Sequence, residues 1–162
     1  MLQKYIRYCT KKVLEAVNIG TMELVNMGHT VFTTEFVLLG LLVQNDSSII
    51  AIMEQLKLDT EGLKKRLTDD IFASLENQEG DIAKTGKIQL VISGEVDKVF
   101  ELALQESKLM EDKFISTEAL FLALFNPQSG KTAEILNKAG LDQKNVRTAI
   151  KEIRGGRKIV DQ

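Results

Sequence analysis

The sequence predicts an all-α fold made of two pseudo-symmetric repeats of four helices each, about eight helices in total. Three observations support this: apolar residues recur with helical spacing, the whole pattern recurs after 83 residues, and the 162 residues contain a single proline. We expect a first repeat at residues 1–75, a connector at 76–92, a second repeat at 93–153, and a tail at 154–162 that begins a linker.

The duplication appears when the chain is slid over itself by 83 positions. This lays Val13–Leu67 on Val96–Ile150 without a gap, and ten of the 55 pairs are identical. Roughly three identities are expected by chance in an unrelated alignment of this length. The best-matched block places Thr33–Leu42 on Ser116–Phe125. Because no gap is needed, we interpret the pattern as an internal repeat.

The first helix of each repeat is predicted to be amphipathic. In the first repeat, one apolar stripe with helical spacing comprises Val13, Ala16, Val17, Gly20, Leu24 and Met27. Gly28 supplies the C-terminal stop. Small residues stand at the centre of the two stripes, Gly20 in the first and Ala103 in the second. We therefore expect another helix to approach closely at these positions.

The second helix of each repeat, Glu35–Val43 and Glu118–Phe125, is apolar on nearly every face and is expected to be buried at the centre. Thr33 and Ser116 precede these helices and are predicted to act as N-caps, each accepting a hydrogen bond from a backbone N–H. Both helices begin with a glutamate, at the end where the helix dipole favours negative charge.

The remaining helices follow the same period. The third and fourth helices are expected at Ser47–Leu56 and Asp59–Leu75 in the first repeat, and at Gly130–Ala139 and Asp142–Ile153 in the second. Asp59 and Asp142 are predicted to be the N-caps of the fourth helices. Glu76–Lys87 is polar and is interpreted as an exposed connector, and Ser93 is predicted to cap the helix that follows it. The tail breaks the last helix at Gly155-Gly156 and carries no packing signal.

Composition argues against several classes of function. Lys+Arg 21 against Asp+Glu 23 gives a net charge of -2, whereas a nucleic-acid binder needs a basic face. One cysteine, Cys9, excludes an intrachain disulfide, and with the single histidine, His29, it is too few for the usual zinc sites. The longest apolar stretch, Phe36–Val43, is far shorter than the roughly 20 residues of a membrane span. We expect a cytoplasmic protein without a metal or a membrane contact.

Candidates for catalysis are weak. Ser129–Thr132 resembles the end of a phosphate-binding loop, but Phe125 stands where that pattern needs glycine, and a helix rather than a strand is expected before it. A small nucleotide-binding enzyme that uses Gly130-Lys131-Thr132 stays open as an alternative, as does a free-standing helical adaptor. His29 is expected to form a hydrogen bond at a helix end, and Cys9 to act as a small, partly buried apolar residue. No catalytic residue is assigned.

Glu35 and Glu118 are the carboxylates that the repeat relates to each other. They either complement the positive end of a helix or remain exposed to bind cationic or N–H groups. In the second case, an apolar seam between two lobes would be rimmed by Glu35, Asp112 and Glu118. Replacing Glu118 by Ala would then weaken binding with little effect on the melting temperature. Phe114 is a further candidate for this binding surface, because an exposed aromatic residue at this position would line a peptide-binding surface.

Two blocks of sequence resemble a known family. They are Thr34-Glu35 followed by Leu38–Leu42, and the run Asp112–Glu118. Together they resemble the double repeat of the Clp N-terminal domain, which precedes the ATPase rings of Clp-type AAA+ unfoldases. The resemblance covers Cys9–Gln162. The tail that begins at Arg154 is most similar to the ClpB group, with ClpC and ClpA next.

The resemblance implies the Clp N-terminal fold and a non-catalytic domain. Such domains capture unfolded or aggregated protein segments, or adaptor proteins, for the ATPase ring of a full-length hexamer. No cofactor is implied for this fragment, and ATP and Mg are expected in the ATPase modules outside it. The fragment is expected to be monomeric and to bind no nucleic acid.

The resemblance also implies binding residues. In some relatives the Thr-Glu helix starts bind cationic or phosphorylated-arginine tags. The positions that match are Thr34-Glu35 and Thr117-Glu118, with Asp112 beside the second pair. Relatives often open their first helix with Phe-Thr, and the matching position here is Thr10, which follows Cys9. The family usually has His after Thr-Glu, where this chain has Phe36 and Ala119, so that part of the surface is changed.

Overall fold

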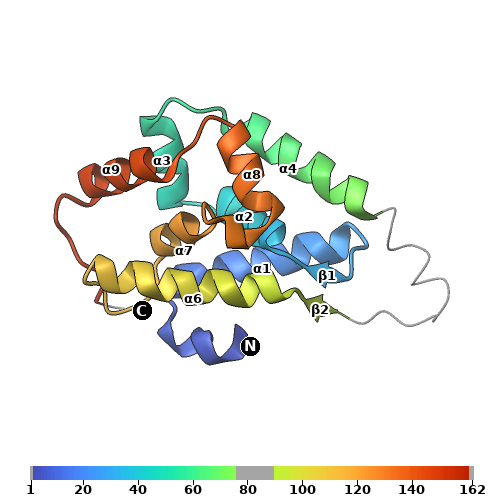
Figure 1. Ribbon diagram of the computed structural model, residues 1–162, viewed down its shortest axis with the longest axis horizontal. Helices are drawn as coiled ribbons and strands as arrows, with labels where there is room; N and C mark the ends of the chain where they lie inside the picture. The colour runs from blue at the N-terminus through green and yellow to red at the C-terminus, as the bar shows by residue number, and fades with distance from the viewer. Residues whose placement is uncertain (1, 76–89, 161–162) are drawn as a thin grey trace.

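The computed structural model describes residues 2–75 and 90–160 (Figure 1). The predicted connector therefore lies mostly outside the described residues. In chain order, with η for 3₁₀-helices, the elements are η1 (Leu2–Tyr8), α1 (Lys11–Asn26), β1 (Val31–Phe32), α2 (Thr34–Val43), α3 (Ser48–Gln55), α4 (Thr60–Leu75), β2 (Val91–Ile92), α6 (Gly94–Leu109), α7 (Thr117–Ala123), η2 (Pro127–Ser129), α8 (Lys131–Lys138) and α9 (Gln143–Arg154).

The all-α prediction is confirmed, and the predicted helices end within about two residues of the observed ones, the usual uncertainty of helix boundaries. The repeat is also visible in the helix lengths. α1 and α6 each have 16 residues, and α3 and α8 each have 8. The sequence analysis did not anticipate η1, η2 or β1.

Three of the predicted helix caps form and two do not. Asp59 Oδ1 accepts from Gly62 N (3.0 Å) at the start of α4. Ser116 Oγ accepts from Ala119 N (3.1 Å), and Asp142 Oδ1 accepts from Asn145 N (2.8 Å). Thr33 and Ser93 precede their helices in extended conformation but make no side-chain cap bond, so these predictions were wrong. The Ser93 N–H instead donates to the carbonyl of Phe32, because this residue continues the pairing of two short strands.

These short parallel pairings tie the start of each repeat to the other repeat. In the β1–β2 pair, Phe32 lies opposite Ile92. A second bridge joins Cys9 to Ile115. Moving along the chain by the 83-residue period carries Phe32 to Ile115 and Ile92 back to Cys9. The two pairings are therefore the same contact, made once by each repeat.

The helices of the two repeats are interlocked. α1 packs on α2, and α6 packs on α7. However, α3 packs against α7 and α9 of the second repeat, and α8 packs against α2 and α4 of the first (Figure 1). Each repeat thus uses the third helix of the other. The apolar seam that we expected to be exposed is instead a buried interface.

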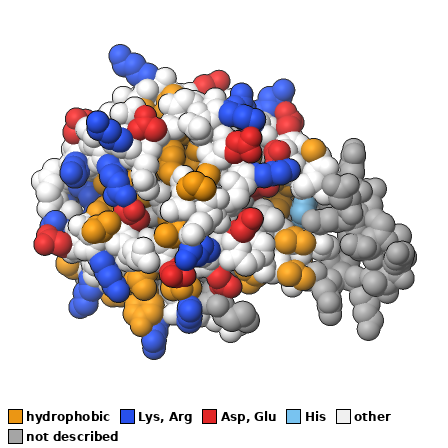
Figure 2. All heavy atoms as spheres, in the orientation of Figure 1, with side chains coloured by type: hydrophobic (Ala, Val, Ile, Leu, Met, Phe, Trp, Pro, Cys, Tyr) orange, Lys and Arg blue, Asp and Glu red, His pale blue; other side chains and the backbone are white. Residues whose placement is uncertain are grey.

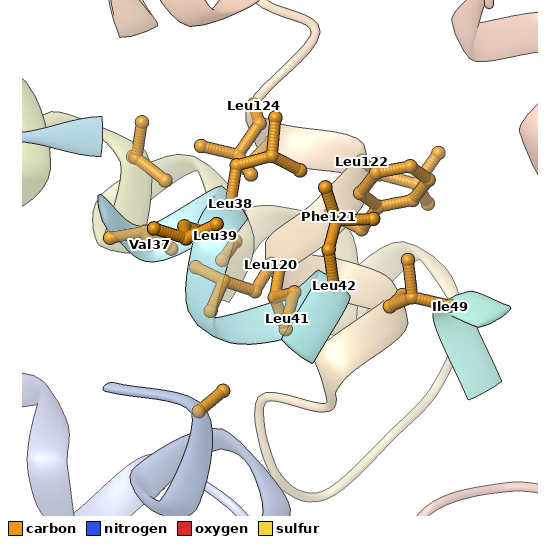
Figure 3. Close-up of a cluster of buried hydrophobic side chains, with 14 of the residues drawn as sticks. Val37, Leu38, Leu39, Leu41, Leu42, Ile49, Leu120, Phe121, Leu122 and Leu124 are labelled. Carbon is orange, nitrogen blue, oxygen red and sulfur yellow. The ribbon is translucent and has the colours of Figure 1, made fainter. Parts of the chain in front are cut away.

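The centre of the molecule is formed by α2 and α7 (Figure 3). Leu38, Leu41 and Leu120 are fully buried, as a helix that is apolar on all sides requires. A single hydrophobic cluster includes residues of both repeats. Among the described residues no single helix is long and apolar enough to span a membrane, and only the α2–α3 pair, bent by 83°, has enough length and apolar character in combination.

α1 and α2 approach each other closely because glycine occupies the contact. A Cβ on Gly40 would overlap the carbonyl oxygen of Ala16, and a Cβ on Gly20 would overlap that of Phe36. The predicted close approach at Gly20 is therefore confirmed. In the second repeat, Ala103 is fully buried at the equivalent position of α6.

Candidate functional site

A pocket of about 270 Å³ lies where the start of α1, the α2–α3 turn and the start of α7 meet. We term it the inter-repeat pocket. Thr10, Thr117 and Glu118, three of the predicted binding residues, line it together. The pocket is also lined by Ser48 from the first repeat and by Ile159 from the tail. Residues that the sequence singled out in the first and the second repeat are thus brought to one place.

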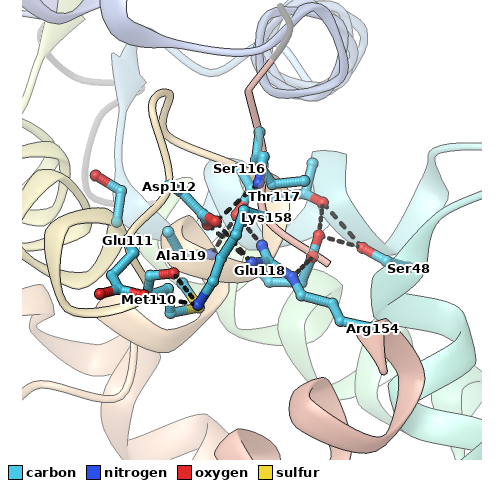
Figure 4. Close-up of polar contacts among 12 residues, drawn as sticks. Ser48, Met110, Glu111, Asp112, Ser116, Thr117, Glu118, Ala119, Arg154 and Lys158 are labelled. Carbon is cyan, nitrogen blue, oxygen red and sulfur yellow. Dashed lines mark hydrogen bonds and ion pairs between the residues drawn. The ribbon is translucent and has the colours of Figure 1, made fainter. Parts of the chain in front are cut away.

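Glu118 lies in the first turn of α7 and is held from both sides (Figure 4). Its Oε2 accepts hydrogen bonds from Ser48 Oγ (2.7 Å) and Thr117 Oγ1 (2.9 Å), and its Oε1 accepts from Arg154 Nε (2.9 Å). Burial alone would raise the pKa of Glu118, but the hydrogen bond from Ser48 and the charge of Arg154 outweigh it and lower that pKa below its ordinary value. Glu118 is therefore an ionised carboxylate although only 9% of it is exposed.

Arg154, in the last turn of α9, connects two carboxylates in this network (Figure 4). Its Nη1 donates to both oxygens of Asp112 at 2.9 Å, and its Nη2 donates to Ser116 Oγ at 3.1 Å. Burial would lower the pKa of Arg154, yet the charge of Glu118 and the hydrogen bonds to Asp112 raise it. The acidic side chains are thus neutralised by the chain's own arginine.

The tail follows Arg154 across the same site. Gly155 and Gly156 have positive φ angles of 57° and 91°, which glycine adopts without strain, and they turn the chain back. Ile159 N then donates to Asp112 Oδ1 (2.9 Å), and Lys113 N donates to Ile159 O (2.6 Å). The expectation that the tail carries no packing signal was wrong for the described residues, because it docks beside the inter-repeat pocket.

The equivalent corner of the first repeat is closed. Thr34 Oγ1 donates to the carbonyl of Ser129 (2.6 Å) and lies 2.7 Å from Thr132 Oγ1. Only 1% of Thr34 is exposed. The hydroxyl that matches Thr117 is therefore used in joining α2 to α8 and is withdrawn from solvent.

Glu35 also differs from its counterpart. Burial, a hydrogen bond with Asp70 and repulsion by that carboxylate raise the pKa of Glu35 to about 8, and the charge of Lys131 offsets this only in part. Glu35 is 7% exposed. Near neutral pH it is therefore largely a protonated acid that can donate to Asp70, whereas Glu118 is an ion.

The two corners predicted to be equivalent are thus distinct in openness and in charge. Of the two alternatives left open for these glutamates, exposure to solvent is not observed, since both are over nine-tenths buried. A ligand of Glu118 must displace Arg154 or bind at the remaining face of the pocket.

Other candidate residues lie apart from this site. Within the described part of the chain, Phe114 is half-buried and does not line the inter-repeat pocket. Cys9 is 1% exposed, and burial raises the pKa of its thiol to about 12, as befits an inert core residue. His29 is buried against Phe36, edge to face, and its Nε2 lies 3.3 Å from Ser74 Oγ.

The phosphate-loop alternative finds no support in the local fold. Gly130 precedes α8, and in the described chain α7 and η2 come before it, where a phosphate-binding loop needs a strand. Thr132 is fully buried and bonded to Thr34. The run Gly130-Lys131-Thr132 therefore serves as a helix start that packs on the first repeat.

Sequence reasoning missed Ser48, Asp70 and Arg154. Arg154 could be noticed only as a cation in the last turn of a helix, which is common for electrostatic reasons alone. Ser48 gave no signal, because a serine at a helix start is ordinary. Ser48 matters only through the interlocked packing that brings α3 to α7, and Arg154 through the packing of α9 on α7 within the second repeat.

The chain matches the family model for the Clp repeat (R) N-terminal domain over residues 9–139. The chaperone protein ClpB of Bacillus anthracis is 24% identical over 153 residues, which cover 94% of this chain and 17% of that protein. A probable ATP-dependent Clp protease ATP-binding subunit of Chlamydia pneumoniae is 25% identical over 142 residues, covering 87% of this chain and 16% of that protein. The chain thus spans about one sixth of the length of these curated relatives.

Solved structures show the same fold. The Hsp104 N-terminal domain from Candida albicans superimposes with a TM-score of 0.73 at 14% identity, covering 94% of this chain and 95% of that one. The N-terminal domain of ClpV1 from E. coli gives a TM-score of 0.71 at 17% identity, covering 92% and 87%. Because the family model matches most of this chain, the chain belongs to the Clp repeat N-terminal domain family. Members of this family are the non-catalytic N-domains of Clp/Hsp100 AAA+ ATPases.

Proposed function

We propose that this chain captures extended segments of unfolded or aggregated proteins, or of adaptor proteins, at the inter-repeat pocket. The observation that carries the proposal is the docking of the chain's own tail there. The guanidinium of Arg154, at the end of α9 where the tail begins, lies on two carboxylates. A backbone N–H of Lys113 pairs with the carbonyl of Ile159, and Ile159 lines the pocket. An extended basic and apolar segment therefore fits this surface.

We further propose that captured segments pass to an ATPase ring that belongs to a longer protein of the ClpB type, with ClpC and ClpA types as alternatives. This proposal is supported by the family membership and by the one-sixth share that the chain covers of its relatives. ATP and Mg would act in those further modules, in a cytoplasmic protein. The domain's own contribution is binding without turnover.

Binding can be tested with a fluorescently labelled polypeptide that is kept unfolded by reduction and alkylation. The wild-type chain is expected to bind it with a Kd on the order of micromolar, about -8 kcal/mol. Glu118→Gln keeps the shape of the side chain but removes its charge, and it is expected to weaken binding about tenfold. The matched control is Glu134→Gln, an exposed glutamate on α8.

The structure revises the earlier expectation for Glu118→Ala. Because Glu118 is buried and pairs with Arg154, its removal leaves a buried guanidinium with one carboxylate fewer and lowers stability. The conservative Gln substitution is therefore the informative variant, with circular dichroism to confirm folding. Equal binding by wild type and Glu118→Gln, or none by the wild type, contradicts the proposal.

A further inference from the structure

A second and larger hollow, of about 370 Å³, lies between the C-terminal end of α6 and the last turns of α9. We term it the α6–α9 groove. Leu122 and Ile150, both buried, form its apolar base, and Met110 and Leu109 stand at its edge. Leu109 is 73% exposed, the highest value among the exposed large apolar side chains that the structure describes.

The rim of the groove is cationic. Arg147, Lys151, Arg154, Arg157 and Lys158 line it, and no acidic side chain does so among the described residues. The chain as a whole carries a net charge of -2, so the charge is reversed locally. In Figure 2, Lys and Arg side chains are frequent over the left-hand end, where Figure 1 places α9 and the end of α6.

The rim combines fixed and available cations. Arg147 is fixed by two hydrogen bonds to the Glu106 carboxylate, at 2.7 and 2.6 Å. Lys151 is exposed and forms no ion pair with any residue that the structure describes. Arg157 is also exposed, and within residues 2–75 and 90–160 its guanidinium donates only to backbone carbonyls near the end of α9. Two positive charges are therefore left for a ligand.

Comparison of the two repeats shows that packing of the fold requires neither the cation at Lys151 nor the exposed apolar side chain at Leu109. The position that matches Lys151 in the first repeat is Thr68, and the position that matches Leu109 is Asn26. The same interlocked fold is thus built once with neutral polar residues at these places and once with a cation and an exposed leucine. The groove's chemistry belongs to the second repeat alone.

We propose that the α6–α9 groove binds an acidic peptide segment of a partner protein. One apolar side chain of the segment rests against Leu109 and Met110, which are accessible beside the buried Leu122 and Ile150. Flanking carboxylates lie against Lys151 and Arg157. A volume of about 370 Å³ is within the range of pockets that enclose a ligand group of this size. Complementary charge fixes where the segment binds, and the apolar edge supplies burial.

Charge and shape favour a peptide over a nucleic acid. A nucleic-acid strand needs a basic surface that follows several phosphates, whereas this rim is short and is bordered by Glu106 and Glu111. Stacked bases also use aromatic platforms, and no aromatic side chain lines the groove among the described residues. The proposal does not rest on the inter-repeat pocket, whose charge has the opposite sign.

The test uses a labelled synthetic peptide with one Leu flanked by Asp and Glu, followed by fluorescence anisotropy. We expect a Kd below about 100 μM at low salt, and weaker binding at 0.5 M salt as the charges are screened. Two control peptides are titrated against the wild-type chain. One has Asn and Gln in place of Asp and Glu, and the other has Ser in place of Leu. Each is expected to bind about tenfold more weakly.

Matched variants locate the site. The double variant Lys151→Glu with Arg157→Glu is expected to lose about tenfold or more in affinity, while Lys65→Glu with Arg66→Glu, two exposed cations of α4, leaves it within about twofold. Equal losses in the two double variants overturn the proposal, as does failure of the acidic peptide to bind or to bind better than its amide version. Tighter binding of a single-stranded oligonucleotide than of the peptide also overturns it. Capture of unfolded polypeptide at the inter-repeat pocket is expected to be unchanged in Lys151→Glu alone, because Lys151 does not line that pocket.

Discussion

The guanidinium of Arg154 lies 2.9 Å from the carboxylate of Glu118, and only about a tenth of either side chain is exposed. Asp112, whose side chain is fully buried, lies at the same distance on the other side. One cation therefore joins the end of α9 to the start of α7 and to the loop before it. Because both carboxylates are withdrawn from water, the arrangement is stable only as long as the cation is present.

We expect Arg154→Ala to lower the free energy of unfolding by about 3–5 kcal/mol, because it leaves the carboxylates of Asp112 and Glu118 buried and unpaired. Chemical denaturation monitored by circular dichroism measures this. The control is Lys138→Ala, which breaks the exposed pair with Glu134 on α8 and is expected to cost no more than about 0.5 kcal/mol. Similar losses in the two variants would show that the buried network contributes little.

A pH dependence follows from Glu35. Its pKa is raised to about 8 in the folded chain from an ordinary value of 4.5, so between these values the folded state holds a proton that the unfolded state has released. Stability from this group is therefore greatest at low pH and falls as the pH rises toward 8, by at most about 1.4 kcal/mol per pH unit.

The measurement is the free energy of unfolding from pH 5 to pH 9 for wild type and for Glu35→Gln. The variant cannot ionise, so it is expected to lose less stability than the wild type as the pH rises through this window. Glu61→Gln, at an exposed position on α4, is expected to follow the wild-type curve. Parallel curves for wild type and Glu35→Gln would mean that Glu35 is ionised in the folded chain.

Glu118 is expected to act in the opposite direction. Its pKa is lowered in the folded chain, because the Ser48 hydrogen bond and Arg154 outweigh burial. The stabilisation is therefore complete above the ordinary glutamate pKa and is lost as the pH falls through the lowered one. Between pH 5 and pH 9 we therefore expect Glu118 to add no pH dependence to the free energy of unfolding. A difference between wild type and Glu35→Gln in this range then reports on Glu35.

The fold class and the helix boundaries were predictable because helical periodicity and the repeat are local properties of the sequence. The interlocking was not. A helix such as α3 has the same apolar pattern whether it packs on its own repeat or on the other one, so the pattern cannot choose between α2 and the α7–α9 pair.

The site was predictable in part for a related reason. Thr10, Thr117 and Glu118 do meet in one pocket, but the equivalence of the two corners failed because their neighbours differ. Asp70, beside Glu35, has Ile153 as its counterpart in the second repeat, and Lys131 has Ser48. The repeat preserved the glutamates while the residues that set their charge state changed.

The close approach of α1 and α2 gives a packing prediction. Gly40→Ala places a methyl group on the carbonyl of Ala16, which is backbone and cannot turn aside, so we expect a loss of about 1–3 kcal/mol in the free energy of unfolding. Gly94→Ala is the control, since nothing lies within 4 Å of a Cβ there. Equal stabilities of the two variants would show that the α1–α2 contact relaxes easily.

The docked tail gives the last prediction, which concerns access to the inter-repeat pocket. A chain that ends at Gly156 keeps Arg154 and the glycine turn after α9 but lacks Ile159, which lines the pocket and is hydrogen-bonded to Asp112 and Lys113. Because an incoming segment no longer competes with the tail, we expect the shortened chain to bind the unfolded polypeptide about threefold to tenfold more tightly than the full chain, a difference of about 1 kcal/mol. Titration by fluorescence anisotropy measures the ratio, and Ile159→Asp in the full chain, which disfavours docking of the tail, is expected to change affinity in the same direction. Weaker binding by both would mean that the tail forms part of the binding surface rather than covering it.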